Sequence, residues 1–143
     1  MATRTGSAEW LGDGKAGSGT VTVGEGVFHG AYSFASRFEE GEGTNPEELI
    51  AAAHAACFSM ALSNMLSGHG HPPESVRTSA RVFLRIVDGA PTIQRIELET
   101  EGRVPGIDQE HFQVHAEEAK AGCPVSRALA GVAEIELTAR LLD

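Results

Sequence analysis

Apolar and polar residues alternate along three segments of the chain, the pattern of strands with one buried face. Residues 76–86 place an apolar residue or threonine at every second position, with three arginines between them. Residues 96–100 and 135–141 repeat the alternation, with glutamates among the outward positions. We expect the inward faces to consist of Val76, Thr78, Ala80, Val82, Leu84, Ile86, Ile96, Leu98, Thr100, Ile135, Leu137, Ala139 and Leu141.

Turn signals connect these segments and mark further strands. The sequence DGAP, residues 88–91, predicts a hairpin between the first two segments, with arginines of one strand facing glutamates of the other. In the first 35 residues TVTV, the turn GEG and then VFHG predict an N-terminal β meander. The acidic, glycine-containing segment Ser36–Gly43 is expected to be a loop.

A long helix is predicted from Asn45, because that residue suits an N-cap and Pro46 suits the first helical position. Glu48 is placed to return a hydrogen bond to the cap. The helix should run for about 22 residues, roughly 33 Å, before Gly68 ends it. Small apolar residues lie on nearly every side, so we expect cover on most faces, with a second subunit as one source of it.

A second helix is expected between Asp108, its N-cap, and Gly122, followed by a short one from Pro124 to Ala130. The resulting order is strands, long helix, hairpin, helix and terminal strand, which defines an α+β fold. A length of 143 residues suits one domain covering residues 1–143.

Charge and targeting signals narrow the function classes. Acidic residues outnumber basic ones 20 to 11, and the net charge of −9 makes nucleic acid an unexpected partner. The N-terminus resembles neither a secretory signal nor a transit peptide. The apolar tract Leu49–Leu62, about 14 residues, is short for a membrane span of roughly 20. We therefore expect a cytoplasmic protein with no membrane partner.

The chain contains two cysteines, Cys57 and Cys123, which are 66 positions apart. Without an export signal, a structural disulfide is not the default state of such a pair. Three interpretations remain open, namely a transient redox pair, a metal site or two inert thiols. A zinc site built from His54, Cys57 and Cys123 would lack one of the usual four ligands, so we expect no metal.

The surroundings of the two cysteines differ. Cys57 lies about three helical turns from the helix start among apolar residues, which raise a thiol pKa. Cys123 precedes Pro124 at a helix start, with Arg127 one turn away, and is the better thiolate by local chemistry. His54 lies three residues before Cys57, so it is either the base of a Cys/His pair or a packed histidine.

Two charged residues have open roles. Arg37 is either a solvated base or a donor that serves a carboxylate and an anionic sulfur together. Glu47 is either a helix-start charge or a partner in the site. Ten residues, about 15 Å along a helix, separate Glu47 from Cys57, so its carboxylate can act on that thiol only through an intermediary or from another subunit.

The segments TNPEELIAAAHAACFSMAL and AGCPVSRAL resemble the OsmC/Ohr family of osmotically inducible and organic hydroperoxide resistance proteins. The resemblance covers essentially the whole chain. YSFASRFEEGEGTNPEE and His54 look more like the OsmC branch. In the Ohr branch the functional arginine lies nearer the N-terminus, where this chain offers only Arg4.

The resemblance implies a thiol peroxidase that reduces organic hydroperoxides. Cys57 would be the peroxidatic cysteine, and Cys123 would resolve its sulfenic acid as a disulfide. Arg37 would lower the Cys57 pKa and polarise the peroxide, while Glu47 would hold Arg37 in place. An external dithiol would restore the thiols, with lipoyl groups as the implied candidate, and no bound cofactor is implied.

The family also implies an intertwined homodimer, with two long helices packed centrally between sheets and each active site at the interface. The distance from Glu47 to Cys57 then ceases to matter if Arg37 and Glu47 serve the partner's cysteine. Two other functions stay open. One is a disulfide reductase or acyl-thiol enzyme on the same fold, and the other is a non-catalytic dimer that binds an apolar ligand or senses oxidants.

Overall fold

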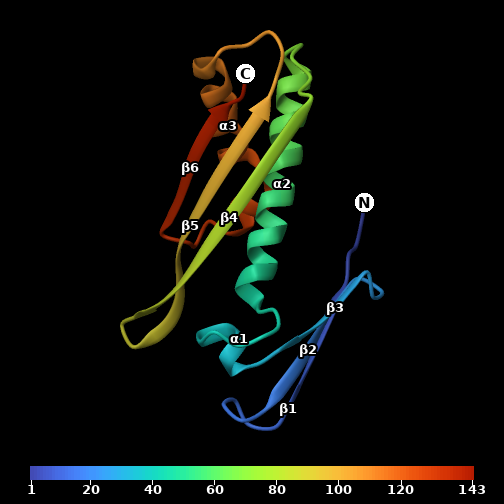
Figure 1. Cartoon of the computed structure of the whole chain (residues 1–143), viewed down its shortest axis with the longest axis vertical. Coiled ribbons are helices and arrows are strands. Elements are labelled where there is room, and N and C mark those ends of the chain that lie inside the picture. Colours follow the sequence, from blue (N-terminus) through green and yellow to red (C-terminus); the bar gives the residue numbers. More distant parts are fainter. The chain divides into compact units, whose positions relative to one another are not determined.

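The first three strands form the predicted meander. In the computed structural model, which describes all 143 residues, β1 (Gly6–Leu11), β2 (Ser18–Val23) and β3 (Phe28–Tyr32) make an antiparallel sheet in the order β1-β2-β3 (Figure 1). The Trp10 and Tyr32 rings lie 5.3 Å apart between centroids. Both rings contact the backbone of Gly19, where a Cβ would come within 2.6 Å of each. Glycine is therefore required at this position.

A short helix, α1 (Phe34–Phe38), stands where a loop was predicted from Ser36 onward. Ser33 and Ser36 form a reciprocal capping box at its start. Ser36 is buried, and its hydroxyl also donates to the Thr44 carbonyl at 2.7 Å. The loop prediction was wrong for residues 36–38 because a serine, in place of the usual Glu or Gln, completes the capping box.

The long helix α2 (Pro46–Gly68) confirms its predicted start and end. The Asn45 side chain accepts a hydrogen bond from the Glu48 amide at 2.8 Å, as an N-cap should. The Glu48 carboxylate does not return a bond to the cap amide as predicted. It accepts instead from the Thr44 hydroxyl at 3.0 Å, because that hydroxyl lies one helical turn before it.

The faces of α2 are not equally covered. Four side chains at intervals of four residues are fully buried, namely His54, Phe58, Leu62 and Leu66. Ala52, Ala56 and Met60 on another face are exposed, Met60 by 67%. At 23 residues, α2 is long and apolar enough to cross a membrane by length and composition, which corrects the estimate from the 14-residue tract. Its buried stripe belongs to the protein core and identifies it as a core helix.

A second sheet has the order β4-β5-β6, formed by β4 (Ser75–Val87), β5 (Ala90–Arg103) and β6 (Glu134–Leu141). The antiparallel β4–β5 hairpin turns at Asp88 and Gly89, both with positive φ. A bulge between Phe83 and Leu84 shifts the register. The skipped residue is Gln94 of β5, so the alternation of β4 continues. Ile86, predicted to face inward, is nevertheless 69% exposed, two residues before the turn at Asp88.

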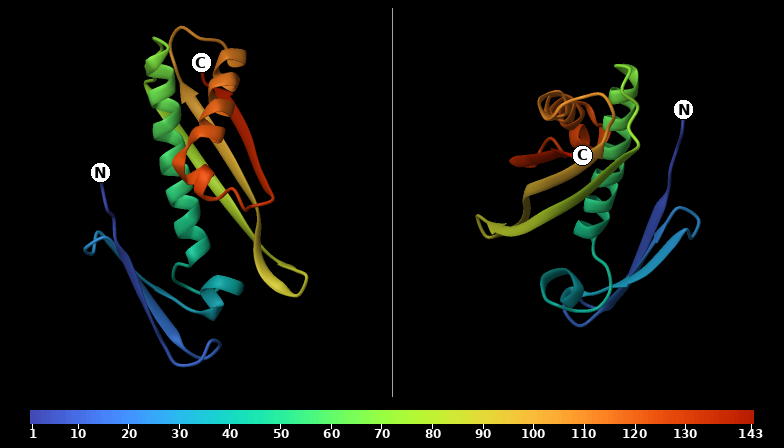
Figure 2. Two further views of the ribbon diagram at one scale, coloured as in Figure 1. Left: turned by 180° about the vertical axis from the view of Figure 1, so that it is seen from behind. Right: turned by 45° about the horizontal axis from the view of Figure 1, so that its top comes forward.

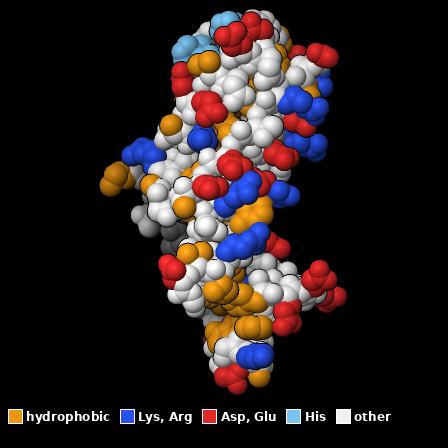
Figure 3. Space-filling model, turned by 90° about the vertical axis from the view of Figure 1, so that its left-hand side faces the viewer, with side chains coloured by type: hydrophobic (Ala, Val, Ile, Leu, Met, Phe, Trp, Pro, Cys, Tyr) orange, Lys and Arg blue, Asp and Glu red, His pale blue; other side chains and the backbone are white.

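The outer face of this sheet confirms the predicted pairing of arginines with glutamates. Arg81 and Glu97 lie in register and form an ion pair at 2.6 Å, and Arg95 pairs with Glu136 of β6 at 2.8 Å. Figure 3 shows acidic and basic side chains interleaved on one face of the molecule. These exposed pairs contribute little stability each.

Strands β5 and β6 run parallel, so the chain crosses over between them through α3 (Gln109–Gly122) and α4 (Pro124–Ala128). Asp108 caps α3 as predicted, whereas α4 ends two residues before the predicted Ala130. Helices α2 and α3 lie on the same face of the sheet (Figure 2). Between helices and sheet lies a core that contains Phe58, Leu62, Leu66, Ile96, Leu98, Phe112, Ala116, Ala119 and Cys123.

By its internal contacts the chain divides into two units, Met1–Leu49 and Ile50–Asp143. Helix α2 begins in the first unit and continues through the second. The α+β class is confirmed, and the single domain over residues 1–143 stays a prediction.

Candidate active site

The two cysteines, 66 positions apart in the sequence, meet in the second unit. Cys57 comes from the middle of α2, and Cys123 occupies the N-cap of α4. Both thiols are free, and Cys57 packs against the core cluster that contains Cys123. Cys57 is partly exposed, whereas Cys123 is completely buried. A reagent that enters from solvent therefore reaches Cys57 first.

The pKa values of the two thiols shift in opposite directions. Burial raises the pKa of Cys57, and donation of its S–H to Cys123 raises it further, against a smaller lowering by the Val125 amide. Burial also acts to raise the pKa of Cys123. The hydrogen bonds from Cys57, from the Ser126 amide and hydroxyl and from the Val125 amide outweigh it, so the pKa of Cys123 lies below its ordinary value. Within this unit the sulfur of Cys123 is the better anion, as its position in the sequence predicted.

His54 lies one helical turn before Cys57, but its hydrogen bond goes elsewhere. Its Nε2 lies 2.7 Å from the Ser126 hydroxyl, and both side chains are buried. The structure therefore favours the bonded histidine over a Cys57/His54 nucleophile–base pair. Ser126 was not predicted as a site residue. The available signal was its place three residues after Cys123, the N3 position of a helix that Cys123 caps.

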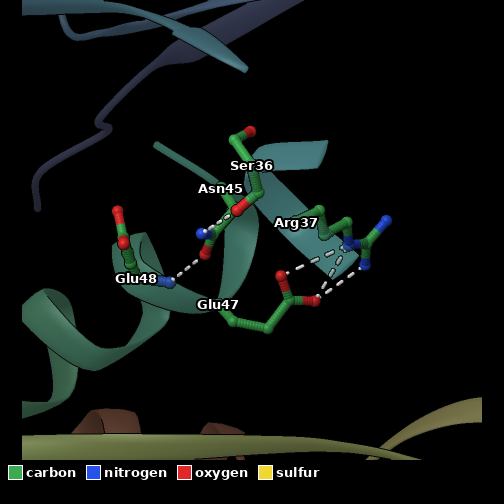
Figure 4. A network of polar contacts seen from close by, with 5 residues as sticks. All are labelled: Ser36, Arg37, Asn45, Glu47 and Glu48. Atoms are coloured by element: carbon green, nitrogen blue, oxygen red, sulfur yellow. Dashed lines mark hydrogen bonds and ion pairs between the residues drawn. The ribbon is translucent and has the colours of Figure 1, made fainter. Parts of the chain in front are cut away.

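Arg37 and Glu47 meet in the first unit, where α1 supplies the arginine and the first turn of α2 the glutamate. The Nη2 of Arg37 lies 2.8 Å from Glu47 Oε1, and its Nε lies 3.1 and 3.2 Å from the two carboxylate oxygens. Glu47 is 7% exposed. Figure 4 shows the remaining guanidinium nitrogen directed away from Glu47. It makes no hydrogen bond and is available to a ligand.

The same close-up explains how the two helices are aligned. The Asn45 side chain donates to the Ser36 carbonyl of α1 at 2.8 Å while it caps α2 (Figure 4). The side-chain amide of Asn45 thus connects α1, which carries Arg37, to α2, which carries Glu47. Arg37 also lines a pocket of about 270 Å³ whose wall is aromatic, with Trp10, Tyr32, Phe34 and Phe38.

No group of three or more His, Cys, Asp or Glu side chains in the chain is arranged to hold a metal ion. His54 is committed to Ser126, and the thiols contact each other. The arrangement instead suits redox chemistry of a thiol pair, in which one sulfur is accessible and the other is buried with a lowered pKa.

An α+β fold that sets an accessible thiol on a long helix against a buried thiol at a helix start defines a class of cysteine-based redox proteins. Residues 39–138 match the family model described as OsmC-like protein, and the chain belongs to this family. The chain is 52% identical to peroxiredoxin OsmC of Escherichia coli (strain K12) over 96% of both chains. It is 33% identical to the organic hydroperoxide resistance protein of Xanthomonas axonopodis pv. citri (strain 306), over 68% of both. These identities favour the OsmC branch.

Solved structures agree with this assignment. The organic hydroperoxide resistance protein OhrB of Bacillus subtilis superposes with a TM-score of 0.73 at 26% identity, over 96% of this chain and 98% of that one. An OsmC-like protein from Mycoplasma pneumoniae superposes with a TM-score of 0.76 over 99% of both chains. At 16% identity, this second likeness concerns the fold alone.

Proposed function

We propose that this protein is a cysteine-based peroxidase that reduces organic hydroperoxides to alcohols. The observation that carries the proposal is the contact between the accessible thiol of Cys57 and the buried thiol of Cys123. The peroxidase class is supported by the relatives, one named a peroxiredoxin and others named organic hydroperoxide resistance proteins. The aromatic pocket beside Arg37 favours an organic substituent over hydrogen peroxide.

The first step uses Cys57. Its thiolate attacks one oxygen of the hydroperoxide, the O–O bond breaks, and the departing alkoxide takes a proton to become the alcohol. Cys57 remains as a sulfenic acid. Cys57 rather than Cys123 has this role because only Cys57 is reachable from solvent.

Arg37 supplies the cation that the thiol pair lacks. The pKa of Cys57 is raised and that of Cys123 is lowered, so the pair by itself favours a thiolate at Cys123 over one at Cys57. A guanidinium beside Cys57 would draw the charge to Cys57 and donate a hydrogen bond to the peroxide. Glu47 fixes Arg37 through two of its nitrogens and leaves the third for this task.

In the second step the Cys123 thiolate attacks the sulfenic sulfur of Cys57. The S–O bond breaks, the departing hydroxide takes a proton from solvent to become water, and a disulfide forms. An external dithiol, such as a lipoyl group, then reduces the disulfide and is itself oxidised.

The protein would work as a homodimer in the cytoplasm. The exposed apolar residues Ala52, Ala56 and Met60 of α2 provide a surface for a second copy. In such a dimer Arg37 and Glu47 would serve either their own Cys57 or that of the partner.

Turnover with cumene hydroperoxide and dihydrolipoamide tests the proposal. The wild type should consume peroxide over many cycles, whereas Cys57→Ser should consume none. Cys123→Ser should complete the first step once and retain a trappable sulfenic acid. A single stoichiometric burst by the wild type would favour an oxidant sensor instead. Hydrolysis of a thioester without peroxide consumption would favour an acyl-thiol enzyme.

A further inference from the structure

A buried polar chain leads away from the thiol pair and has no part in the first step. His54 Nε2 lies 2.7 Å from Ser126 Oγ, and Ser126 is the third residue of α4, the helix that begins after Cys123. His54 is completely buried, Ser126 is 7% exposed, and Cys123 is completely buried. Such a chain in a low-dielectric interior orients its members strongly.

The direction of this chain follows from the other ring nitrogen of His54. The Nδ1 atom is buried and has no hydrogen-bond partner. A buried N–H without an acceptor is rarer in proteins than a buried acceptor without a donor, so the proton belongs on Nε2. His54 then donates to Ser126 Oγ, which leaves the Ser126 hydrogen free for the Cys123 thiol, whose pKa a hydrogen bond from Ser126 lowers.

We propose that His54 and Ser126 are positioning residues of the resolving step, which hold Cys123 as a thiolate aimed at the sulfenic acid of Cys57. The inference rests on the peroxidase function proposed above. His54 acts through Ser126, and neither residue touches the peroxide.

The hydrogen bonds from His54 through Ser126 to Cys123 matter most once Cys57 is oxidised. In the reduced pair a hydrogen bond from the Cys57 S–H lowers the pKa of Cys123, and oxidation replaces that S–H by a sulfenic O–H on the oxygen that later departs. The Ser126 hydroxyl, held in place by His54, is then a donor that can stay with the Cys123 sulfur throughout the attack. The pKa of His54 is lowered by burial, so the ring stays neutral and keeps its Nε2 hydrogen for Ser126.

Ser126→Ala in the full chain separates the two steps. In single turnovers with cumene hydroperoxide, disulfide formation should slow by about tenfold, the effect of losing one hydrogen bond to a charged group. Dimedone should therefore trap far more sulfenic acid than in the wild type. Ser126→Thr, which keeps the hydroxyl, should restore the rate. Ser59→Ala is the matched control, because it removes a hydroxyl bonded to Thr78 at 2.8 Å in the same unit.

Two further measurements report directly on the hydrogen bonds that link His54, Ser126 and Cys123. In the Cys57→Ser background, Ser126→Ala should raise the Cys123 pKa. This pKa is measured from the absorbance of the thiolate across a pH series. In the wild type, nitrogen NMR of His54 should show the Nε2–H tautomer, which needs no variant. Unchanged disulfide formation in folded Ser126→Ala, or an Nδ1–H tautomer, overturns the inference. If the wild type consumes no hydroperoxide, the peroxidase proposal fails. The His54 tautomer and the Cys123 pKa still decide whether hydrogen bonds run from His54 through Ser126 to Cys123.

Discussion

The guanidinium of Arg37 has two tasks, to bind Glu47 and to leave one nitrogen for a ligand. Two of its nitrogens bind Glu47, and the third is directed away from it. Its side chain is 37% exposed, so the charge is neither buried nor fully hydrated. A cation held in this way can stabilise an anion without reorganising, which is the arrangement that electrostatic catalysis uses.

Replacement of this cation should act on the first step. In Arg37→Ala the Cys57 pKa should rise, because burial and the Cys123 hydrogen bond both raise it with nothing to oppose them except the Val125 amide. Sulfenic acid formation should slow by at least tenfold near neutral pH and recover as the pH rises, since the thiolate is the reactive form. Rapid mixing with cumene hydroperoxide across a pH series measures this. Arg127→Ala, on α4, is a control that should leave the rate close to wild type, and an equal loss there would contradict a specific role for Arg37.

His54 should make stability depend on pH. Burial lowers its pKa below the ordinary 6.5, so below about pH 6.5 the unfolded chain binds a proton that the folded chain does not. The free energy of unfolding should therefore fall as the pH drops, by at most about 1.4 kcal/mol per pH unit from this residue. Denaturant unfolding between about pH 7 and 5 should give a steeper loss for wild type than for His54→Gln. Parallel curves for the two proteins would show that His54 has the same pKa in the folded and unfolded states.

At the scale of elements, the junction between α1 and α2 aligns the site. The Asn45 amide has two roles, since its oxygen caps α2 and its nitrogen bonds the Ser36 carbonyl. An N-cap of this type contributes about 1 kcal/mol, and aspartate caps as well as asparagine. The two roles can therefore be separated by substitution.

Asn45→Asp should keep the cap but lose the bond to Ser36, whereas Asn45→Ala should lose both. We expect Asn45→Ala to reduce the free energy of unfolding by about 1 kcal/mol and Asn45→Asp to change it much less. Both should slow Cys57 oxidation several-fold, because Arg37 is carried by α1. Denaturant titration and rapid mixing give the two quantities. An oxidation rate unchanged in Asn45→Asp would mean that α1 is aligned by its own capping box and by the Ser36–Thr44 bond.

At the scale of the whole molecule, the two residue pairs lie in different units of the chain. Arg37 and Glu47 belong to Met1–Leu49, and Cys57 and Cys123 belong to Ile50–Asp143. About 15 Å of helix separates Glu47 from Cys57. A dimer formed through the exposed face of α2 would give each thiol pair two possible sources of an arginine.

Mixing two inactive variants distinguishes these sources. Cys57→Ser keeps Arg37, and Arg37→Ala keeps Cys57, so a mixed dimer has one complete site only if the two residues act across the interface. Refolding the two variants together should then restore a substantial fraction of peroxidase activity over either variant alone. Sedimentation should show dimers throughout. Dimers without restored activity would place Arg37 and Cys57 of the same chain in one site.

The sequence by itself determined the elements whose causes are local. The alternation of apolar and polar residues predicted β4, β5 and β6. Asn45 and Pro46 predicted the start of α2, and Asp108 and Gly122 predicted the bounds of α3. These signals are local because capping and one-sided burial act within a few residues. The thiolate preference of Cys123 was equally local. The helix at Arg37 was missed, since a serine-only capping box leaves a weak signal. The exposure of Ile86 was missed as well, because alternation reports the face of a strand and not whether another element covers it.

Only the tertiary structure decided which distant residues meet. The contact of Cys57 with Cys123, the bond from His54 to Ser126 and the pairing of Arg37 with Glu47 each join different elements. Sequence spacing fixes distance along a helix, but the path of a chain between elements depends on how apolar faces are buried together. That packing settled the bonded partner of His54 and left Cys57 as the thiol that solvent can reach.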